Sequence, residues 1–121
     1  MAKFNATDIT KVIEDGLVTF KVVEWEEKEN ASFQNIVAVT LLCRDGKGAS
    51  KEIKDTFIID DNPWKLGTFA KAIGEYEQYK SGEMEGNHAV GKVGKCFIYR
   101  RKFKVDGKER KVVAVKEYQF D

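Results

Sequence analysis

The sequence has few of the residues that mark secreted, metal-binding or low-complexity proteins. Its 121 residues include one proline, one histidine and two cysteines. One proline and ten glycines leave no stretch typical of a flexible interdomain linker. Cys43 and Cys96 have neither the CxxC spacing of a zinc site nor the number needed for a disulfide framework. We therefore expect both thiols to be small buried core residues of a protein in a reducing cytoplasm.

Long apolar runs are also missing. Residues 1–5 lack the apolar core of a signal peptide, and no segment approaches the roughly 20 apolar residues that cross a bilayer. The charged fraction of 34% beside a hydrophobic fraction of 42% indicates a folded domain with a well-solvated surface. We therefore predict no membrane partner and one domain over residues 1–121, with residues 1–14 as an N-terminal extension.

Residue arrangements typical of enzymes are missing as well. His88 is the only histidine and has no nearby partner for acid–base catalysis. Residues 86–92 match the G-x4-G-K start of a phosphate-binding loop, but Val93 stands where a hydroxyl would bind magnesium. The nearest candidates for a two-metal nuclease site are Asp55, Asp60 and Asp61. A position on a strand surface explains Asp55 more simply, and the helix cap and turn explain Asp60 and Asp61 more simply. We expect a noncatalytic protein without cofactor or metal.

Charge is distributed unevenly along the chain. The formal net charge is only +1, yet residues 1–90 hold 11 basic and 16 acidic side chains, whereas residues 91–121 hold 10 and 4. Binding of a polyanion depends on local positive potential rather than on net charge. The basic C-terminal quarter is therefore the first candidate for a binding surface.

Three stretches of the first 60 residues have the alternating pattern of β-strands. They are residues 17–25, residues 34–44 and residues 51–60, of which the second is apolar on both faces, as in a central strand. The acidic residues 24–32 are predicted to form a loop or the frayed end of a hairpin. For residues 7–13 a short helical turn and an added edge strand remain alternatives.

A single helix is predicted over residues 63–73. Asp61 or Asn62 provides its N-cap, a proline occupies its first position, and Gly74 stands where a C-terminal cap belongs. One apolar stripe is expected to pack on the sheet: Leu66, Phe69, Ala70 and Ile73. Residues 75–92 are predicted to be a long connection.

Two further strands are predicted, over residues 93–105 and 111–120, joined at Asp106-Gly107, which is a strong hairpin signal. The order β-β-β-α-β-β matches a mostly β, five-stranded OB-fold-like barrel, in which Trp64 could close one end. The alternative is an open α+β sheet with the helix across one face. The small size and the helix position favour the barrel.

The basic hairpin mixes cations with aromatic rings. A two-residue turn would pair Phe103 with Arg110 and Arg101 with Val112. One face would then hold Tyr99, Arg101, Phe103 and Arg110, and the other Arg100, Lys102, Lys104 and Lys111. Cations grip phosphates in a salt-sensitive way, and exposed rings stack on any base. The alternative is a solvated edge hairpin whose lysines prevent aggregation and whose rings lie in the core.

Two segments resemble a family of short bacteriophage proteins of unknown function. The run DNPWKLGTFAKAIG at residues 61–74, preceded by residues 56–59, resembles that family's helix region, and residues 90–95 resemble its approach to the basic strand. The resemblance covers roughly residues 15–118. It implies an OB-like single-stranded DNA-binding protein of phage DNA replication or recombination, located in the cytoplasm of a bacterial host.

We therefore expect a noncatalytic, sequence-independent single-stranded DNA-binding protein. A phage replication or recombination protein is an expected partner, and a homodimer could extend the short nucleotide track. The acidic residues 24–29 would repel phosphate, which favours a protein partner there. The alternative is a phage interaction or assembly module that binds no nucleic acid. The candidate binding residues are Lys95, Tyr99, Arg100, Arg101, Lys102, Phe103, Lys104, Arg110 and Lys111.

Overall fold

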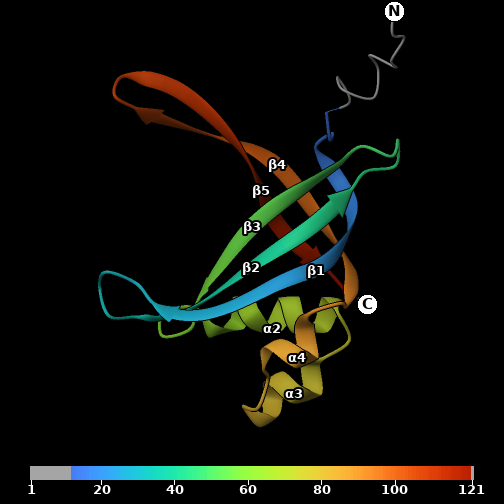
Figure 1. The fold of residues 1–121 in the computed structure, drawn as a ribbon, viewed down its shortest axis with the longest axis vertical. Coiled ribbons are helices and arrows are strands. Elements are labelled where there is room, and N and C mark those ends of the chain that lie inside the picture. Colours follow the sequence, from blue (N-terminus) through green and yellow to red (C-terminus); the bar gives the residue numbers. More distant parts are fainter. Residues whose placement is uncertain (1–11, 121) are drawn as a thin grey trace, which may run out of the picture.

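A computed structural model describes residues 12–120 of the chain. It contains one antiparallel sheet of five strands in the order β3-β2-β1-β4-β5 (Figure 1). The strands are β1 (Gly16–Glu29), β2 (Asn35–Arg44), β3 (Ser50–Ile58), β4 (Val93–Val105) and β5 (Lys108–Gln119). The helices, all between β3 and β4, are α2 (Pro63–Ala72), α3 (Tyr76–Ser81) and α4 (Gly86–Ala89). The predicted mostly β fold is confirmed.

The N-terminal side of the domain starts earlier than the sequence suggested. Most of the segment 7–13, for which a helical turn or an edge strand was expected, lies outside the described residues. Ile13 is neither helix nor strand, but its side chain is only 2% exposed and belongs to the core. The predicted extension over residues 1–14 therefore overlaps the packed domain. In the described part of the chain no helix is long and apolar enough to span a membrane.

Strand β1 continues four residues beyond its predicted end at Trp25. Of the two alternatives for the acidic stretch, a loop or the frayed end of a hairpin, the structure shows the hairpin, with residues 24–29 paired with β2 from Glu24 opposite Thr40 to Glu29 opposite Asn35. Trp25 packs against the core, whereas the acidic side chains around it are exposed. Backbone pairing with an apolar neighbouring strand thus outweighs the loop-like composition of this segment.

Helix α2 lies across one end of the curled sheet, between the sheet and the two shorter helices in Figure 1. Its predicted apolar stripe is buried, and Phe69 is the centre of an aromatic cluster, with ring centroids 5.1 to 6.1 Å from Phe20, Phe57 and Tyr118. Trp64, by contrast, is 66% exposed. The expectation that it closes a barrel end is wrong, because the apolar stripe faces the core and Trp64 lies outside it.

The helix caps differ in part from the prediction. Asn62 occupies the N-cap position, but its side chain makes no capping hydrogen bond. Asp60 and Asp61 instead accept hydrogen bonds from the Asn35 amide at 2.8 Å and from the Gln34 side chain at 2.6 Å. These two carboxylates therefore tie the start of α2 to the start of β2. Gly74 follows the helix at φ 77°, as its C-terminal position predicted.

The predicted long connection over residues 75–92 and the single helix are both wrong, since this segment forms α3 and α4. Tertiary contacts support these short helices. The Tyr79 ring packs beside Gly67 and its hydroxyl donates to the Pro63 carbonyl at 2.9 Å. Trp25 packs against Gly86 of α4. Helices this short depend on such packing, which local sequence signals do not reveal.

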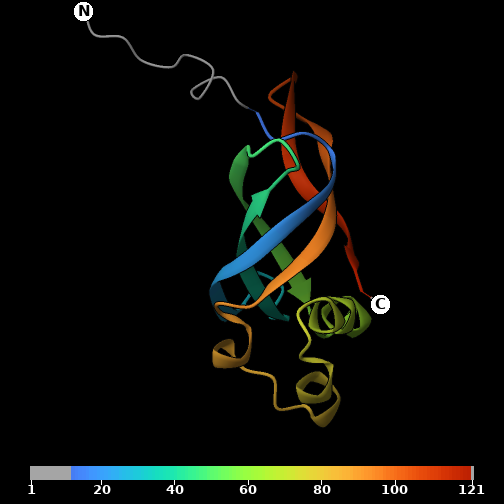
Figure 2. The ribbon, with the colours of Figure 1, turned by 90° about the vertical axis from the view of Figure 1, so that its right-hand side faces the viewer.

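The sheet is strongly curled but is not closed into a barrel. Between residues 12 and 120 no backbone pairing joins its outer strands, β3 and β5. A side-chain hydrogen bond bridges them, in which the Tyr118 hydroxyl donates to Asp55 Oδ2 at 2.6 Å. Lys65 Nζ of α2 donates to Asp55 Oδ1 at 2.8 Å and so joins the helix to β3. The views in Figures 1 and 2 show the resulting twisted sheet above its helices.

Both cysteines are buried and free, as the sequence predicted. Cys43 on β2 and Cys96 on β4 lie in the interior of the curled sheet. A hydrogen bond with Cys43, together with burial, raises the pKa of the Cys96 thiol. These thiols act as small core residues.

Candidate nucleic-acid interface

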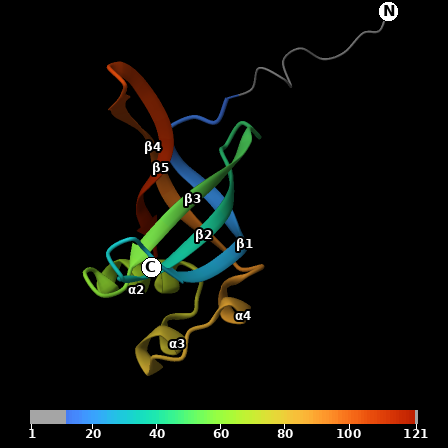
Figure 3. The same ribbon diagram turned by 60° about the vertical axis from the view of Figure 1, so that its left-hand side comes forward.

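The C-terminal hairpin extends beyond the rest of the sheet as a two-stranded arm. Pairing of β1 with β4 stops at Gly16 opposite Ile98, so residues 99–114 pair only with one another in the described structure. We call this segment the arm. Figure 3 shows it projecting away from the helices, at the opposite end of the domain. Both of its faces are therefore accessible to a ligand.

The turn of the arm is the one its sequence predicted. Asp106 and Gly107 have φ values of 52° and 77°, which is the conformation of a two-residue type I′ turn. The predicted register is confirmed, because Phe103 lies opposite Arg110 and Arg101 lies opposite Val112. Opposed side chains on one face have Cβ atoms about 5 Å apart. The register therefore places rings and cations side by side.

The outer face of the arm carries the predicted mixture. Phe103 is 40% exposed and Tyr99 is half-buried, with the exposed Arg101 between them on β4 and Arg110 opposite Phe103. Neither ring belongs to the core cluster of the described residues. The alternative in which both rings fill the core is thus wrong. This face can offer ring surfaces for stacking beside guanidinium groups.

The opposite face of the arm holds the remaining cations. Lys102, Lys104 and Lys111 are exposed, and Lys102 approaches Glu109 at 3.9 Å. Between residues 99 and 112 the chain has seven Lys or Arg and two Asp or Glu, a net charge of +5. Exposed ion pairs at such distances contribute little. The arm therefore keeps a strong positive potential on both faces.

Two of the nine candidate residues have other surroundings. The Arg100 guanidinium donates to the Asp15 carboxylate and to the Ile13 carbonyl, so it anchors the base of the arm to the start of β1. Lys95 lies within the sheet, opposite Thr19 and six residues before Arg101, a distance of roughly 20 Å along β4. The structure groups the other seven candidates on the arm and leaves Lys95 apart.

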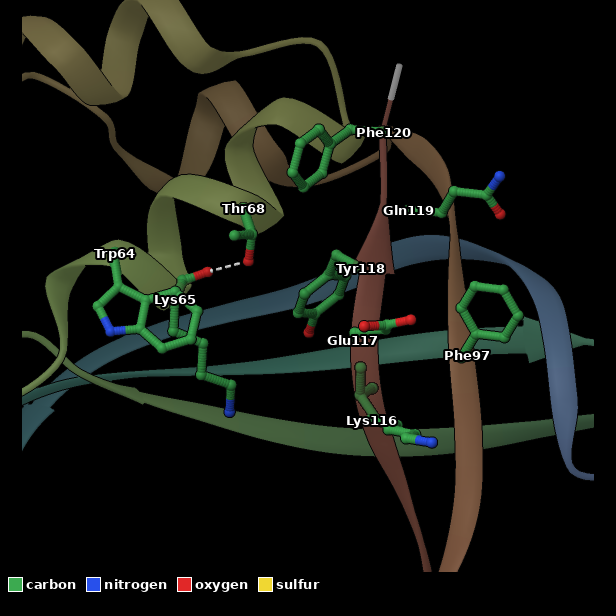
Figure 4. Close-up of a pocket in the computed structure, with 10 residues that line it drawn as sticks. Trp64, Lys65, Thr68, Phe97, Lys116, Glu117, Tyr118, Gln119 and Phe120 are labelled. Carbon is green, nitrogen blue, oxygen red and sulfur yellow. Dashed lines mark hydrogen bonds between the residues drawn. The ribbon is translucent and has the colours of Figure 1, made fainter.

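A groove beside β5 contains aromatic residues that sequence reasoning did not connect. It has a volume of about 620 Å³ and lies between α2 and the last residues of β5 (Figure 4). Trp64 is 66% and Phe120 40% exposed, and Lys71 Nζ lies 5.0 Å from the Phe120 ring centroid. Phe97, half-buried on β4, also lines it. Its members come from three distant segments, so no local signal could have identified it.

The acidic end of β1 lies away from the arm. Glu24 accepts a hydrogen bond from Thr40 at 3.2 Å, and Glu27 lines a hollow with Glu83 and Glu85 beside α4. Figure 1 shows the helices and the arm at opposite ends of the sheet. The objection that acidic residues near the first loop would repel phosphate therefore does not apply to a ligand bound on the arm.

The three aspartates considered for metal binding have separate structural partners. Asp55 accepts hydrogen bonds from Tyr118 and Lys65, while Asp60 and Asp61 hold the start of β2. Residues 12–120 contain no group of three His, Cys, Asp or Glu side chains placed to bind one metal ion.

Neither a scan against protein-family models nor a comparison with curated protein sequences gives a match for this chain. Its function must therefore be inferred from the site itself.

Proposed function

We propose that this protein is a noncatalytic, sequence-independent single-stranded DNA-binding protein that uses the arm. The observation that supports the proposal most is the register of the hairpin, which places the exposed Phe103 ring opposite Arg110 and beside Arg101. Unpaired bases expose ring faces that aromatic side chains can stack on, and the adjacent guanidinium groups suit phosphates. A surface of this kind contacts every nucleotide by the same means, so it does not select sequence.

The charge of the arm favours the same ligand. Six exposed cations lie along the two strands of the arm: Arg101, Lys102, Lys104, Lys108, Arg110 and Lys111. Neutralising phosphates releases the counterions of the nucleic acid, and this release favours binding at low salt. Duplex DNA would satisfy the cations but would hide its base faces from Tyr99 and Phe103. The pairing of rings with cations therefore favours single strands over duplexes.

An OB-type origin of the fold is part of the proposal. In support, the strand order β3-β2-β1-β4-β5, with α2 inserted between β3 and β4, has the connectivity of that barrel. The hydrogen bond between Tyr118 and Asp55 lies where the barrel would close. OB domains bind oligonucleotides with the loop between their fourth and fifth strands, which is the position of the arm.

We further propose that the protein acts in phage DNA replication or recombination, in the cytoplasm of a bacterial host. Support for this setting is the resemblance of residues 61–74 and 90–95 to short phage proteins. In that role it would cover exposed strands while a replication or recombination enzyme works on them.

Titration of a fluorescently labelled oligo-dT tests the proposal. With about five phosphates contacted, the affinity should fall about a hundredfold between roughly 50 and 200 mM salt. A Lys104→Gln variant should bind more weakly and reduce the slope of log affinity against log salt by about 0.7. Lys80→Gln, on α3 at the other end of the domain, is the matched control and should behave like the wild type.

Two results would contradict the proposal. Absence of oligo-dT binding at low salt would favour the alternative, an interaction or assembly module whose arm meets an acidic protein surface. Equal affinity for duplex and single-stranded DNA would remove the role assigned to the rings.

A further inference from the structure

The loop between β1 and β2 presents an unsupported aromatic ring to solvent. Phe33 is 84% exposed, the highest exposure among the large apolar residues of the described chain. Its φ of 60° is left-handed, a conformation that bulky side chains rarely adopt. Backbone strain of this kind is retained mainly where it serves a function. A glycine would suit the turn better, so the ring itself needs an explanation.

Hydrogen bonds hold this loop without using the ring. Asn30 Oδ1 accepts from the amides of Ser32 and Gln34 at 2.9 and 3.0 Å, and the Phe33 amide donates to the Asn30 carbonyl at 3.0 Å. Gln34 in turn donates to Asp61 at 2.6 Å. These bonds fix the backbone of the loop and so set the direction in which the exposed Phe33 side chain points, and the loop has little backbone flexibility to lose on binding.

A complementary hollow lies at the other end of β2. It is lined by the apolar side chains of Leu42 and Val93, which are 41% and 66% exposed, and by the exposed Lys21 and Arg44. The strand register aligns Leu42, Lys21 and Val93 in one row across three strands, and the row continues onto β3 with the exposed Glu52 opposite Leu42. None of the residues that line the hollow is acidic.

The charges around the two features are opposite. Carboxylates flank the Phe33 loop: Glu29 lies opposite Asn35, and Asp60 and Asp61 bind the start of β2. The hollow offers cations, one of which, Lys21, lies between the two apolar side chains. An aromatic anchor in acidic surroundings thus matches a hollow whose lining combines apolar side chains with the cations Lys21 and Arg44.

We propose that Phe33 of one copy inserts into the Leu42–Val93 hollow of a second copy. The two features cannot meet within one chain, because Asn35 beside the loop and Leu42 lie seven residues apart on β2, roughly 23 Å. Figure 1 shows the two ends of this strand on opposite sides of the domain. In this head-to-tail contact each added copy leaves one loop and one hollow free, so the copies form an open chain, or a ring where the rotation between copies closes. Such growth needs no DNA.

Sedimentation velocity without DNA tests this contact over a wide range of concentrations. The wild type should form oligomers whose size increases with protein concentration and decreases as salt is added. Phe33→Gly should raise the dissociation constant about tenfold or more, as loss of an aromatic anchor does. Leu42→Glu should do the same by placing a carboxylate in the hollow, and Val93→Glu tests the same hollow if that variant does not fold.

Mixing the two variants distinguishes this contact from others. The Phe33→Gly copy keeps its hollow and the Leu42→Glu copy keeps its ring, so an equimolar mixture should form dimers and nothing larger. Phe103→Ser is the matched aromatic control on the arm, and it should lose oligo-dT affinity while associating like the wild type. A monomeric wild type, unchanged association of Phe33→Gly, or a mixture without dimers would overturn the proposal. None of these results would bear on DNA binding by the arm.

Discussion

Replacing Tyr118 with Phe removes one hydroxyl from the seam between β3 and β5. The side chain is 6% exposed, and its hydroxyl donates to Asp55 Oδ2 at 2.6 Å. The ring would keep its contacts with Phe20 and Phe69, whose centroids lie 5.8 and 5.1 Å away. The change is therefore confined to a single hydrogen bond across the open side of the sheet.

The expected cost follows from what Asp55 loses. A hydrogen bond to a charged group contributes about 1.5–3 kcal/mol. Asp55 Oδ1 would retain Lys65 Nζ at 2.8 Å and the Thr56 amide at 2.9 Å, but Oδ2 would have no remaining donor among the described residues. We expect the free energy of unfolding to fall by about 2 kcal/mol and Tm to fall by about 8 °C for a domain of this size.

Urea unfolding measures this cost. The midpoint for Tyr118→Phe should be lower by about 1 M, with an unchanged m-value. Tyr99→Phe removes the same hydroxyl from the half-buried arm residue and should have little effect. If the Tyr118→Phe midpoint lay within about 0.2 M of the wild type, the seam would not depend on this bond.

Three further measurements test other parts of the structure. Burial and the nearby Asp55 raise the pKa of Tyr118, so the stabilising contribution of its neutral hydroxyl is complete below about pH 10 and is lost as pH rises further. Above that pH the urea midpoint should fall more steeply for the wild type than for Tyr118→Phe. Equal slopes of midpoint against pH for the two proteins would contradict this. Gly94→Ala should lower the free energy of unfolding by about 2–3 kcal/mol, because the added Cβ would lie 2.8 Å from the Ala72 carbonyl oxygen. The control is Gly46→Ala, whose Cβ meets no atom within 4 Å and which should leave the free energy of unfolding nearly unchanged. Phe33→Gly should stabilise the protein by about 1 kcal/mol by relieving left-handed strain, and a destabilised variant would refute that strain.

Features with local sequence signals were predicted well. Strand β4 has the predicted bounds, and Asp106-Gly107 determined both the turn and the register of the arm. The apolar stripe and Gly74 likewise located α2. In each case the deciding interactions lie within a few residues of one another in the sequence.

Features that depend on distant segments could not be predicted. The seam joins Asp55 and Tyr118, which are 63 residues apart, and no pattern in either strand indicates their contact. The arm is free because β1 begins at Gly16 and leaves residues 99–114 without a third strand. Composition could not decide between a loop and the end of a hairpin for the acidic end of β1, which pairs with β2 as a strand.

The most direct test of the proposed function compares ring and charge variants of the arm in oligo-dT binding. Changing Tyr99 and Phe103 together to Leu keeps the charge of the arm, so the salt dependence should match that of the wild type. The affinity should nevertheless fall, by about 1–3 kcal/mol for each base that loses its stacking partner. Circular dichroism and the unfolding midpoint would show that the variant is folded. A folded variant with wild-type affinity would contradict the account, because binding would then rest on cations alone.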